Sequence, residues 1–244
     1  MAIPTGAFLN AIGILLGGLF GLARRAPLSA GAQNFFRCAL GAAAIVLGLR
    51  LLWLNINGTF LSCAKEIFTA LLAVVLGNLT GKLLQLQKIS NRLGRFAGNL
   101  IKSAQSSPPR KMSDGFNACA ILFCAAPLGF LGALTDGLAG DFYLLAVKAV
   151  MDGLAMASFV KIFGWFSALS AFPAFLFLGA ITFALQFYAK PFLDTHNLIC
   201  PVNAAAGFVA LAVAVVILEV RKVELANYLP ALAVAPLLTW LLNH

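Results

Sequence analysis

Long apolar runs, separated by short polar or basic stretches, make up most of this 244-residue chain. A helix needs about 20 mainly apolar residues to cross the hydrocarbon core of a bilayer. The runs have this length, which predicts an all-α fold, a polytopic transmembrane helical bundle of about eight spans. Pro230 and Pro236 interrupt the last run, so we expect this segment to be kinked or only partly inserted. The predicted spans are 7–23, 36–54, 66–84, 116–134, 142–161, 167–188, 202–219 and 226–243.

Composition favours a lipid environment over water. Hydrophobic residues make up 61% of the chain and charged residues 10%, whereas soluble domains usually contain about 25% charged residues. So few charged side chains cannot cover the surface of a soluble domain of this length. The net charge of +9 does not indicate nucleic-acid binding, because the basic residues lie in short clusters between the apolar runs.

The basic residues also predict how the chain is oriented. Lys and Arg near span ends are retained on the cytoplasmic side of a bacterial inner membrane. If the N-terminus lies outside, 13 of the 17 basic residues fall at inner loops or inner span ends, and the exceptions are Arg50, Lys65, Lys148 and Lys190. The sequence therefore predicts a multi-pass protein of the cytoplasmic (inner) membrane with both termini outside.

One long connection, residues 85–113, divides the chain into an N-terminal three-span group (1–84) and a C-terminal five-span group (114–244). Its apolar residues recur every three or four positions and share one helical face, while its basic residues lie largely on the other side. This pattern predicts an amphipathic helix that binds anionic lipid headgroups; the alternative is an ordinary solvated basic loop. The apolar residues are Leu86, Ile89, Leu93, Phe96 and Leu100, and the basic ones are Lys88, Arg92, Arg95 and Lys102.

Lys148 and Asp152 are the sharpest candidates for function, because they lie four residues apart inside the fifth span and share a helical face. A charge near the centre of a membrane costs about 2.5–3.5 kcal/mol on insertion scales, so it is seldom kept without a use. The functional interpretation is a substrate or ion pathway. The structural alternatives are a salt bridge that fixes helix packing, or a lysine that reaches the outer interface.

Other polar residues extend this candidate pathway. Asp136 lies in a short outer loop, where it could attract cations to an external mouth. Asn10 and Asn117 are amides within spans that could either bridge helices or supply oxygen to an ion. The dipeptide Asn-Ala opens the first, fourth and seventh spans, which leaves open an inverted three-plus-three repeat.

Prolines within apolar runs mark candidate helix breaks, where freed carbonyl groups must find partners or line a cavity. They are Pro127, Pro173 and Pro236. No residue pattern supports an enzyme: the two histidines, His196 and His244, lie in a loop and at the C-terminus, and no nucleophile has a base at useful spacing. We also expect no metal and no cofactor, because the cysteines and histidines lack ligand spacing.

The chain carries a series of short motifs: Leu9-Asn10-Ala11-Ile12-Gly13, Gly17-Gly18-Leu19-Phe20-Gly21, Val75-Leu76-Gly77 with Gly81, Asp136-Gly137-Leu138, Gly140-Asp141, Lys148, Asp152-Gly153, Phe166-Ser167-Ala168 and Ala226-Asn227-Tyr228-Leu229-Pro230-Ala231-Leu232 with Ala235-Pro236. Together these motifs resemble the YqgA/YdfK-like family of bacterial inner-membrane proteins (domain of unknown function 554). The resemblance covers nearly the whole chain, and it implies an integral membrane protein without indicating a substrate. The chain departs from the family pattern at Ala155, Met156 and Leu178, where relatives tend to carry hydroxyl residues and a glutamine.

Together these features predict a secondary transporter or channel-like carrier of an unknown small solute or ion. The alternative is a non-transporting membrane scaffold or accessory subunit, whose charge pair serves packing or partner binding. A cavity that reaches Lys148 and Asp152 would favour transport, and a dry, packed pair would favour the scaffold. The sequence leaves a homo-oligomer open.

Overall fold

The computed structural model describes residues 3–24, 29–56, 58–106 and 111–243, and this part of the chain is helical apart from short connections. Its elements are α1 (Thr5–Ala23), α2 (Ala30–Asn55), α3 (Phe60–Leu83), α4 (Leu86–Ser106), α5 (Lys111–Ala125), α6 (Pro127–Ala139), α7 (Tyr143–Phe163), the 3-10 helix η2 (Trp165–Ser170), α8 (Ala171–Ala184), the π-helical segment η3 (Leu185–Ala189), α9 (Lys190–Thr195), α10 (Ile199–Ile217), the 3-10 helix η4 (Leu225–Tyr228) and α11 (Ala231–Asn243).

Local sequence explains where several helices begin and end. The side chains of Ser29 and Thr59 cap α2 and α3 by accepting a hydrogen bond from the backbone N–H three residues further on. Gly140 and Gly164 end α6 and α7 with φ values of +70° and +84°, which glycine adopts without a steric penalty. Gln85, with φ of +55°, makes the turn that separates α3 from α4.

The predicted number of spans is confirmed. Among the described residues, seven helical segments are long and apolar enough to cross a membrane, and α5 with α6 makes an eighth across a bend of 55°. Each predicted span overlaps one of these segments. The bend falls at Ala126, directly before Pro127, which is the first residue of α6.

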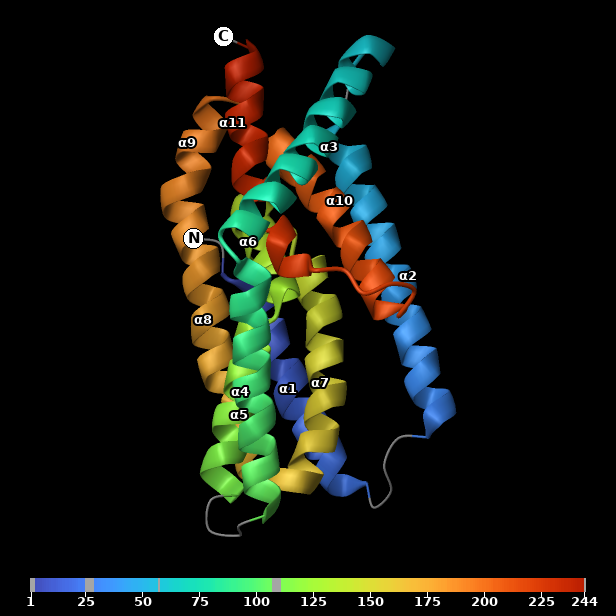
Figure 1. Ribbon diagram of the computed structural model, residues 1–244, viewed down its shortest axis with the longest axis vertical. Coiled ribbons are helices and arrows are strands. Elements are labelled where there is room, and N and C mark those ends of the chain that lie inside the picture. Colours follow the sequence, from blue (N-terminus) through green and yellow to red (C-terminus); the bar gives the residue numbers. More distant parts are fainter. Residues whose placement is uncertain (1–2, 25–28, 57, 107–110, 244) are drawn as a thin grey trace.

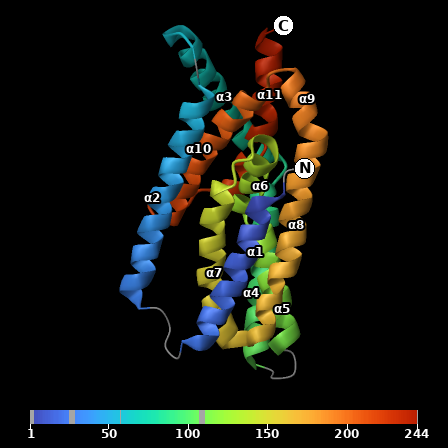
Figure 2. The same cartoon turned by 180° about the vertical axis from the view of Figure 1, so that it is seen from behind.

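The helices from the two halves of the sequence are interleaved in space. The most extensive contacts of α1 are with α7, those of α2 are with α10, and those of α3 are with α11. In Figures 1 and 2, α1, α4, α5 and α7 occupy one end of the long axis and α3, α10 and α11 the other, while α2 and the α8–α9 rod extend along both. The three-span and five-span groups on either side of residues 85–113 therefore pack against each other.

Glycines allow the closest helix contacts. A β-carbon built on Gly17 of α1 would lie 2.0 Å from the carbonyl oxygen of Gly153 on α7. Gly48 of α2 meets Gly207 of α10 in the same way, with a distance of 2.9 Å to the carbonyl oxygen. Such small-residue contacts let helix backbones approach in membranes, where van der Waals packing drives association.

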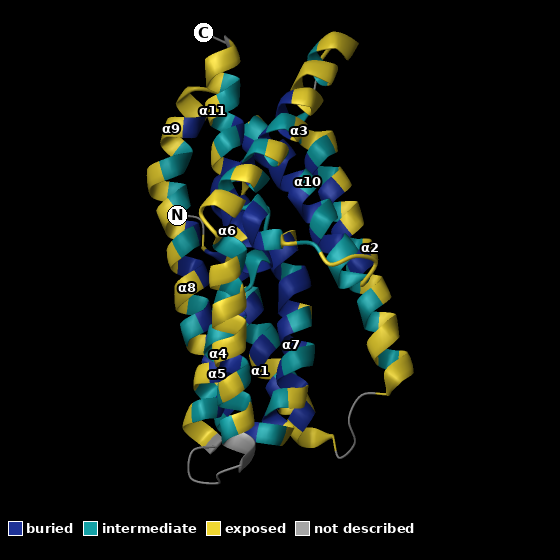
Figure 3. Cartoon of the chain, viewed as in Figure 1, coloured by how far each residue is buried: buried dark blue, intermediate teal, exposed yellow. Residues whose placement is uncertain are grey.

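The surface of the bundle is apolar, as expected for contact with lipid. Buried residues gather where α1, α6, α7 and α10 meet, and exposed residues cover the outward faces of α2, α3 and α8 (Figure 3). Leu19 and Trp53, for example, are 64% and 82% exposed. A continuous apolar exterior of this kind marks a membrane-facing surface.

Three long-range contacts join segments that the basic residues assign to the same side of the membrane. At the predicted outer side, the backbone N–H of Gly6 donates to Asp136, and Arg50 forms an ion pair with Asp141. At the predicted inner side, Arg37 forms an ion pair with Glu219. The outward position of the termini and the location in an inner membrane stay predictions.

Candidate functional site

Lys148 and Asp152 form a buried ion pair on α7. Their four-residue spacing places both on one face of the helix, and the Lys148 ammonium group donates to the Asp152 carboxylate. The side chains are 2% and 12% exposed, respectively, so the lysine does not reach the membrane interface. An ion pair this well shielded from water needs both charges, because removing one leaves the other without compensation.

The broken span lies against the lysine. The ring of Phe123, near the end of α5, has its centroid 5.9 Å from Lys148 Nζ, a cation–π distance. On α6, a β-carbon at Gly129 would lie 2.8 Å from Lys148 Cε, so the absence of a side chain there makes room for the lysine. The site thus sits where one span changes direction, and broken spans often place backbone dipoles near a solute in transporters.

Asn10 of α1 completes the buried polar group. It is fully buried and lies beside the Asp152 carboxylate. Neither its Nδ2 nor its Oδ1 makes a hydrogen bond of normal geometry with a described residue. An unsatisfied buried polar group costs about 1–3 kcal/mol, so this amide needs either a small polar guest or another explanation.

A second group of polar residues lies at the predicted outer ends of α1, α6 and α7. Asp136 Oδ2 accepts a hydrogen bond of 3.0 Å from the backbone N–H of Gly6, at the start of α1. Asp141 accepts from the backbone N–H of Tyr143 at 3.3 Å and pairs with Arg50, whose guanidinium carbon lies 4.7 Å from the Tyr143 ring centroid. These contacts fasten the helix ends. The prediction that Asp136 lies in an outer loop is wrong, because this residue is buried in the last turn of α6, and it does not join the Lys148–Asp152 pair.

Replacing Asp136 by Ala should lower the free energy of unfolding by about 1.5–3 kcal/mol, the usual contribution of a hydrogen bond to a charged group. The loss would leave the N–H of Gly6 without its partner at the start of α1. Chemical denaturation in detergent would measure it. The matched control is Asp194→Ala, since Asp194 is exposed on α9; equal losses in the two variants would contradict the prediction.

The other residues predicted to belong to the site lie apart from the Lys148–Asp152 pair. Asn117 is exposed on α5 and lies outside the buried group. Pro173 falls in the first turn of α8, where a missing N–H breaks no helical bond, and its carbonyl accepts a 3.8 Å contact from the Cys124 thiol. Pro236 lies inside α11, which is helical on both sides of it.

The basic connection forms the predicted helix, α4, which runs alongside α5 (Figure 1). Ala97 is buried, whereas Ile89, Leu93 and Phe96 are 49%, 40% and 55% exposed. An apolar strip therefore faces outward next to the exposed basic residues Lys88, Arg92, Arg95 and Lys102. Contact of this face with anionic lipid stays a prediction.

Two further observations bear on the chemistry of the site. None of the four cavities found along the described helices is lined by Lys148 or Asp152. No three His, Cys, Asp or Glu residues lie close enough to hold a metal ion in the part of the chain that the structure describes. The pair is therefore packed and closed in this conformation, the arrangement expected for the scaffold alternative.

Several polar contacts join residues that are far apart in the sequence, so the sequence alone could not indicate them. Arg50 and Asp141 are 91 residues apart, and the amide contact between Asn203 and Asn55 joins residues 148 apart. A basic residue within a predicted span, Arg50, was the one available signal that an acidic partner exists.

The fold and the buried pair define a polytopic α-helical membrane protein with an intramembrane ion pair beside a broken span. The chain belongs to the DUF554 family, described as "Protein of unknown function", whose model matches residues 5–240. It is 26% identical to "Uncharacterized protein YqgA" of Escherichia coli (strain K12), over 94% of each chain. It is 24% identical to "Uncharacterized membrane protein YdfK" of Bacillus subtilis (strain 168), over 98% of this chain and 96% of the relative. No solved structure matches.

Proposed function

We propose that this membrane protein is a secondary transporter that exchanges a small cation for a proton at Asn10, Lys148 and Asp152. The observation that carries the proposal is the fully buried Asn10 amide, whose side chain interacts with the Asp152 carboxylate but makes no hydrogen bond of normal geometry with any described residue. A salt bridge that serves packing alone does not need an unsatisfied amide next to it. An amide oxygen and a carboxylate are ligands suited to a small hard cation.

The exchange follows from the charge balance of the pair. A monovalent cation that binds the Asp152 carboxylate replaces the Lys148 ammonium as its counter-charge. Two cations beside one buried carboxylate are unfavourable, so Lys148 gives up its proton as the cation enters. The site then carries the same net charge before and after binding, and the closed packing corresponds to an occluded conformation between two open ones.

Reconstituted protein tests this exchange. Vesicles containing the wild type and an internal pH-sensitive dye should report proton movement after pulses of Na⁺ or K⁺, and Asp152→Asn should abolish it. The matched control is Asp194→Asn, which makes the same chemical change at an exposed position. Unchanged proton movement in Asp152→Asn would overturn the assignment.

A second candidate is the non-transporting scaffold or accessory subunit, favoured by the absence of Lys148 and Asp152 from the described cavities. In that case the pair stabilises packing alone. The wild type would then give no signal with either Na⁺ or K⁺.

Asn10→Leu separates the two candidates. Leucine has a similar shape and removes two unsatisfied polar atoms, so the free energy of unfolding should rise by about 1–3 kcal/mol. Under the transport proposal this more stable variant loses cation-driven proton movement. Thermal denaturation and the dye assay on the same preparation check both parts, and a stable variant with full exchange would contradict the role of Asn10.

A further inference from the structure

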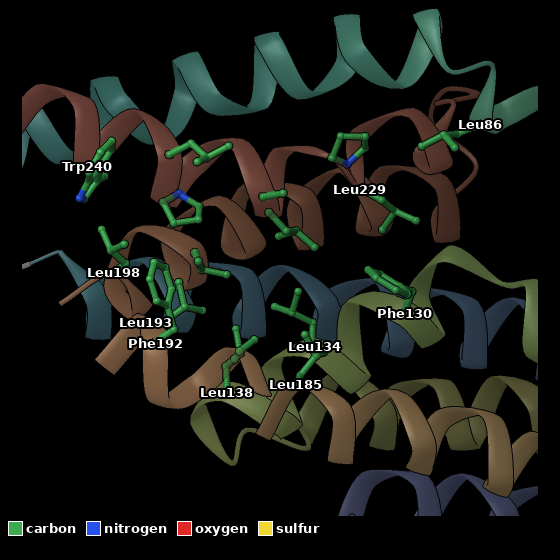
Figure 4. Close-up of a pocket in the computed structure, with 17 residues that line it drawn as sticks. Leu86, Phe130, Leu134, Leu138, Leu185, Phe192, Leu193, Leu198, Leu229 and Trp240 are labelled. Atoms are coloured by element: carbon green, nitrogen blue, oxygen red, sulfur yellow. The ribbon is translucent and has the colours of Figure 1, made fainter. Parts of the chain in front are cut away.

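A long apolar groove runs beside α11, away from the buried ion pair. It has a volume of about 820 Å³ and is lined by 17 residues, all of them apolar in type. Figure 4 shows Leu86, Leu229 and Phe130 at one end, and Trp240, Leu198 and Phe192 at the other. The groove is therefore a slot between α11 on one side and α6 with the α8–α9 rod on the other.

Irregular helices form both walls of this slot. Leu185 and Ala189, the two ends of the π-helical segment η3, line one wall, and Pro230 and Pro236 line the other. A π-helical turn inserts an extra residue and shifts the helix that follows, and such turns occur frequently at functional sites. Proline removes a backbone hydrogen bond and bends its helix. The π-helical segment and the two prolines therefore lie on opposite walls of the slot.

The length of the slot can be compared with the thickness of the membrane. Leu229 and Trp240 lie eleven residues apart along the wall, which corresponds to about 16 Å at the rise of an α-helix. The slot continues beyond Leu229 to Leu86, so it covers more than half of the roughly 30 Å hydrocarbon core. An acyl chain whose headgroup lies at the Leu86 end would extend along the slot toward Trp240.

Basic residues near one end of the slot indicate which kind of lipid it would bind. The end at Leu86 adjoins the turn at Gln85, which accepts a hydrogen bond from the backbone of Lys88 and donates one to the carbonyl of Lys82. Both lysines are exposed, as are Arg221 and Lys222 in the link that leads to η4. The backbone N–H groups of Gln87 and Ala226 and the side chains of Gln87 and Asn227 tie this link to the start of α4.

Within the described chain, none of these four basic residues is in an ion pair. The neighbouring carboxylate of Glu224 already accepts a hydrogen bond from Asn227. Four exposed basic residues thus outnumber the Glu224 carboxylate around the Gln85 turn and the link to η4, so this end, the mouth of the slot, carries a net positive charge, and the slot itself is apolar. We propose that the slot binds one acyl chain of an anionic phospholipid, whose phosphate group rests on Lys82 and Lys88. This inference does not depend on the transport proposal.

Tryptophan fluorescence tests the proposal directly, because Trp240 lines the slot. A Trp53→Phe, Trp165→Phe background leaves Trp240 as the remaining tryptophan. Phosphatidylglycerol with brominated acyl chains should quench it more strongly than brominated phosphatidylcholine at equal content in the vesicles. The expected preference is about fivefold for each lysine at the mouth.

Two kinds of variant distinguish the contribution of the lipid headgroup to binding from that of the acyl chain. Lys82→Gln with Lys88→Gln should remove the preference for phosphatidylglycerol, while Arg92→Gln with Arg95→Gln, an equal loss of charge further along α4, should keep it. Ala233→Phe, which fills the slot, should remove the preference with the lysines intact; should that variant fail to fold, the two charge pairs still decide. Equal quenching by both lipids in the wild type, or a preference that survives the loss of Lys82 and Lys88, would overturn the proposal.

Discussion

Asp152→Asn should lower the free energy of unfolding by about 3–5 kcal/mol, the usual loss when one partner of a buried ion pair is removed. The Lys148 side chain is 2% exposed and pairs with Asp152. The variant would leave its ammonium group in a low-dielectric interior with an amide in place of a counter-charge. Unfolding in mixed micelles with increasing denaturing detergent would measure the loss.

The exposed ion pair between Arg37 and Glu219 supplies the control. Its side chains are 38% and 70% exposed, so solvent screens the attraction and Glu219→Gln should cost less than about 1 kcal/mol. Similar losses in the two variants would show that Lys148 finds water or another partner after Asp152 is neutralised, which contradicts a sealed site.

The double variant Lys148→Met, Asp152→Leu extends this test. Replacing both members of a buried ion pair by apolar residues of similar volume is often neutral or stabilising. We therefore expect the double variant to recover most of the stability lost in Asp152→Asn. If it folds as well as the wild type, loss of cation-driven proton movement in that variant reflects chemistry and not misfolding.

The course of the chain through the membrane was predictable from local information. Apolar run length predicts the spans, and the proline at position 127 predicts a break that the structure places at Ala126. The amphipathic period in residues 86–100 predicts α4 in the same way. Each of these features depends on residues close together in the sequence, and so each is visible without a structure.

The surroundings of the ion pair were not predictable, because they come from distant segments. Asn10 and Asp152 meet only after α1 packs on α7, and the Phe123 ring reaches Lys148 from the broken span. Spacing along α7 predicts that the two charges can pair, but it cannot distinguish a sealed pair from one that lines a cavity. The groove beside α11 was missed for the same reason, since no sequence period signals a π-helical segment.

The contact that brings Asn10 to Asp152 leads to the second large effect. Gly17→Leu should lower the free energy of unfolding by about 3 kcal/mol or more, which is at or above the upper end of the usual cost of overpacking. A β-carbon at Gly17 would lie 2.0 Å from the Gly153 carbonyl oxygen and 2.5 Å from its α-carbon. Backbone atoms cannot move aside as a flexible side chain can, so α1 and α7 must separate. Gly17→Ala should also lower the free energy of unfolding, but by a smaller amount.

Glycines without neighbours make the matched control for this effect. Nothing lies within 4 Å of a β-carbon built on Gly94 or Gly98 of α4. There Gly→Ala should be neutral or should raise stability by up to about 1 kcal/mol, because alanine favours a helix over glycine. Gly→Ala should therefore lower the free energy of unfolding at Gly17 and leave it unchanged or raise it at Gly94. Detergent unfolding of the two alanine variants measures the difference, and a Gly17→Ala variant as stable as Gly94→Ala would show that α1 and α7 do not touch at Gly153. In that case Asn10 would lose its position beside Asp152, and the cation site would lose its amide.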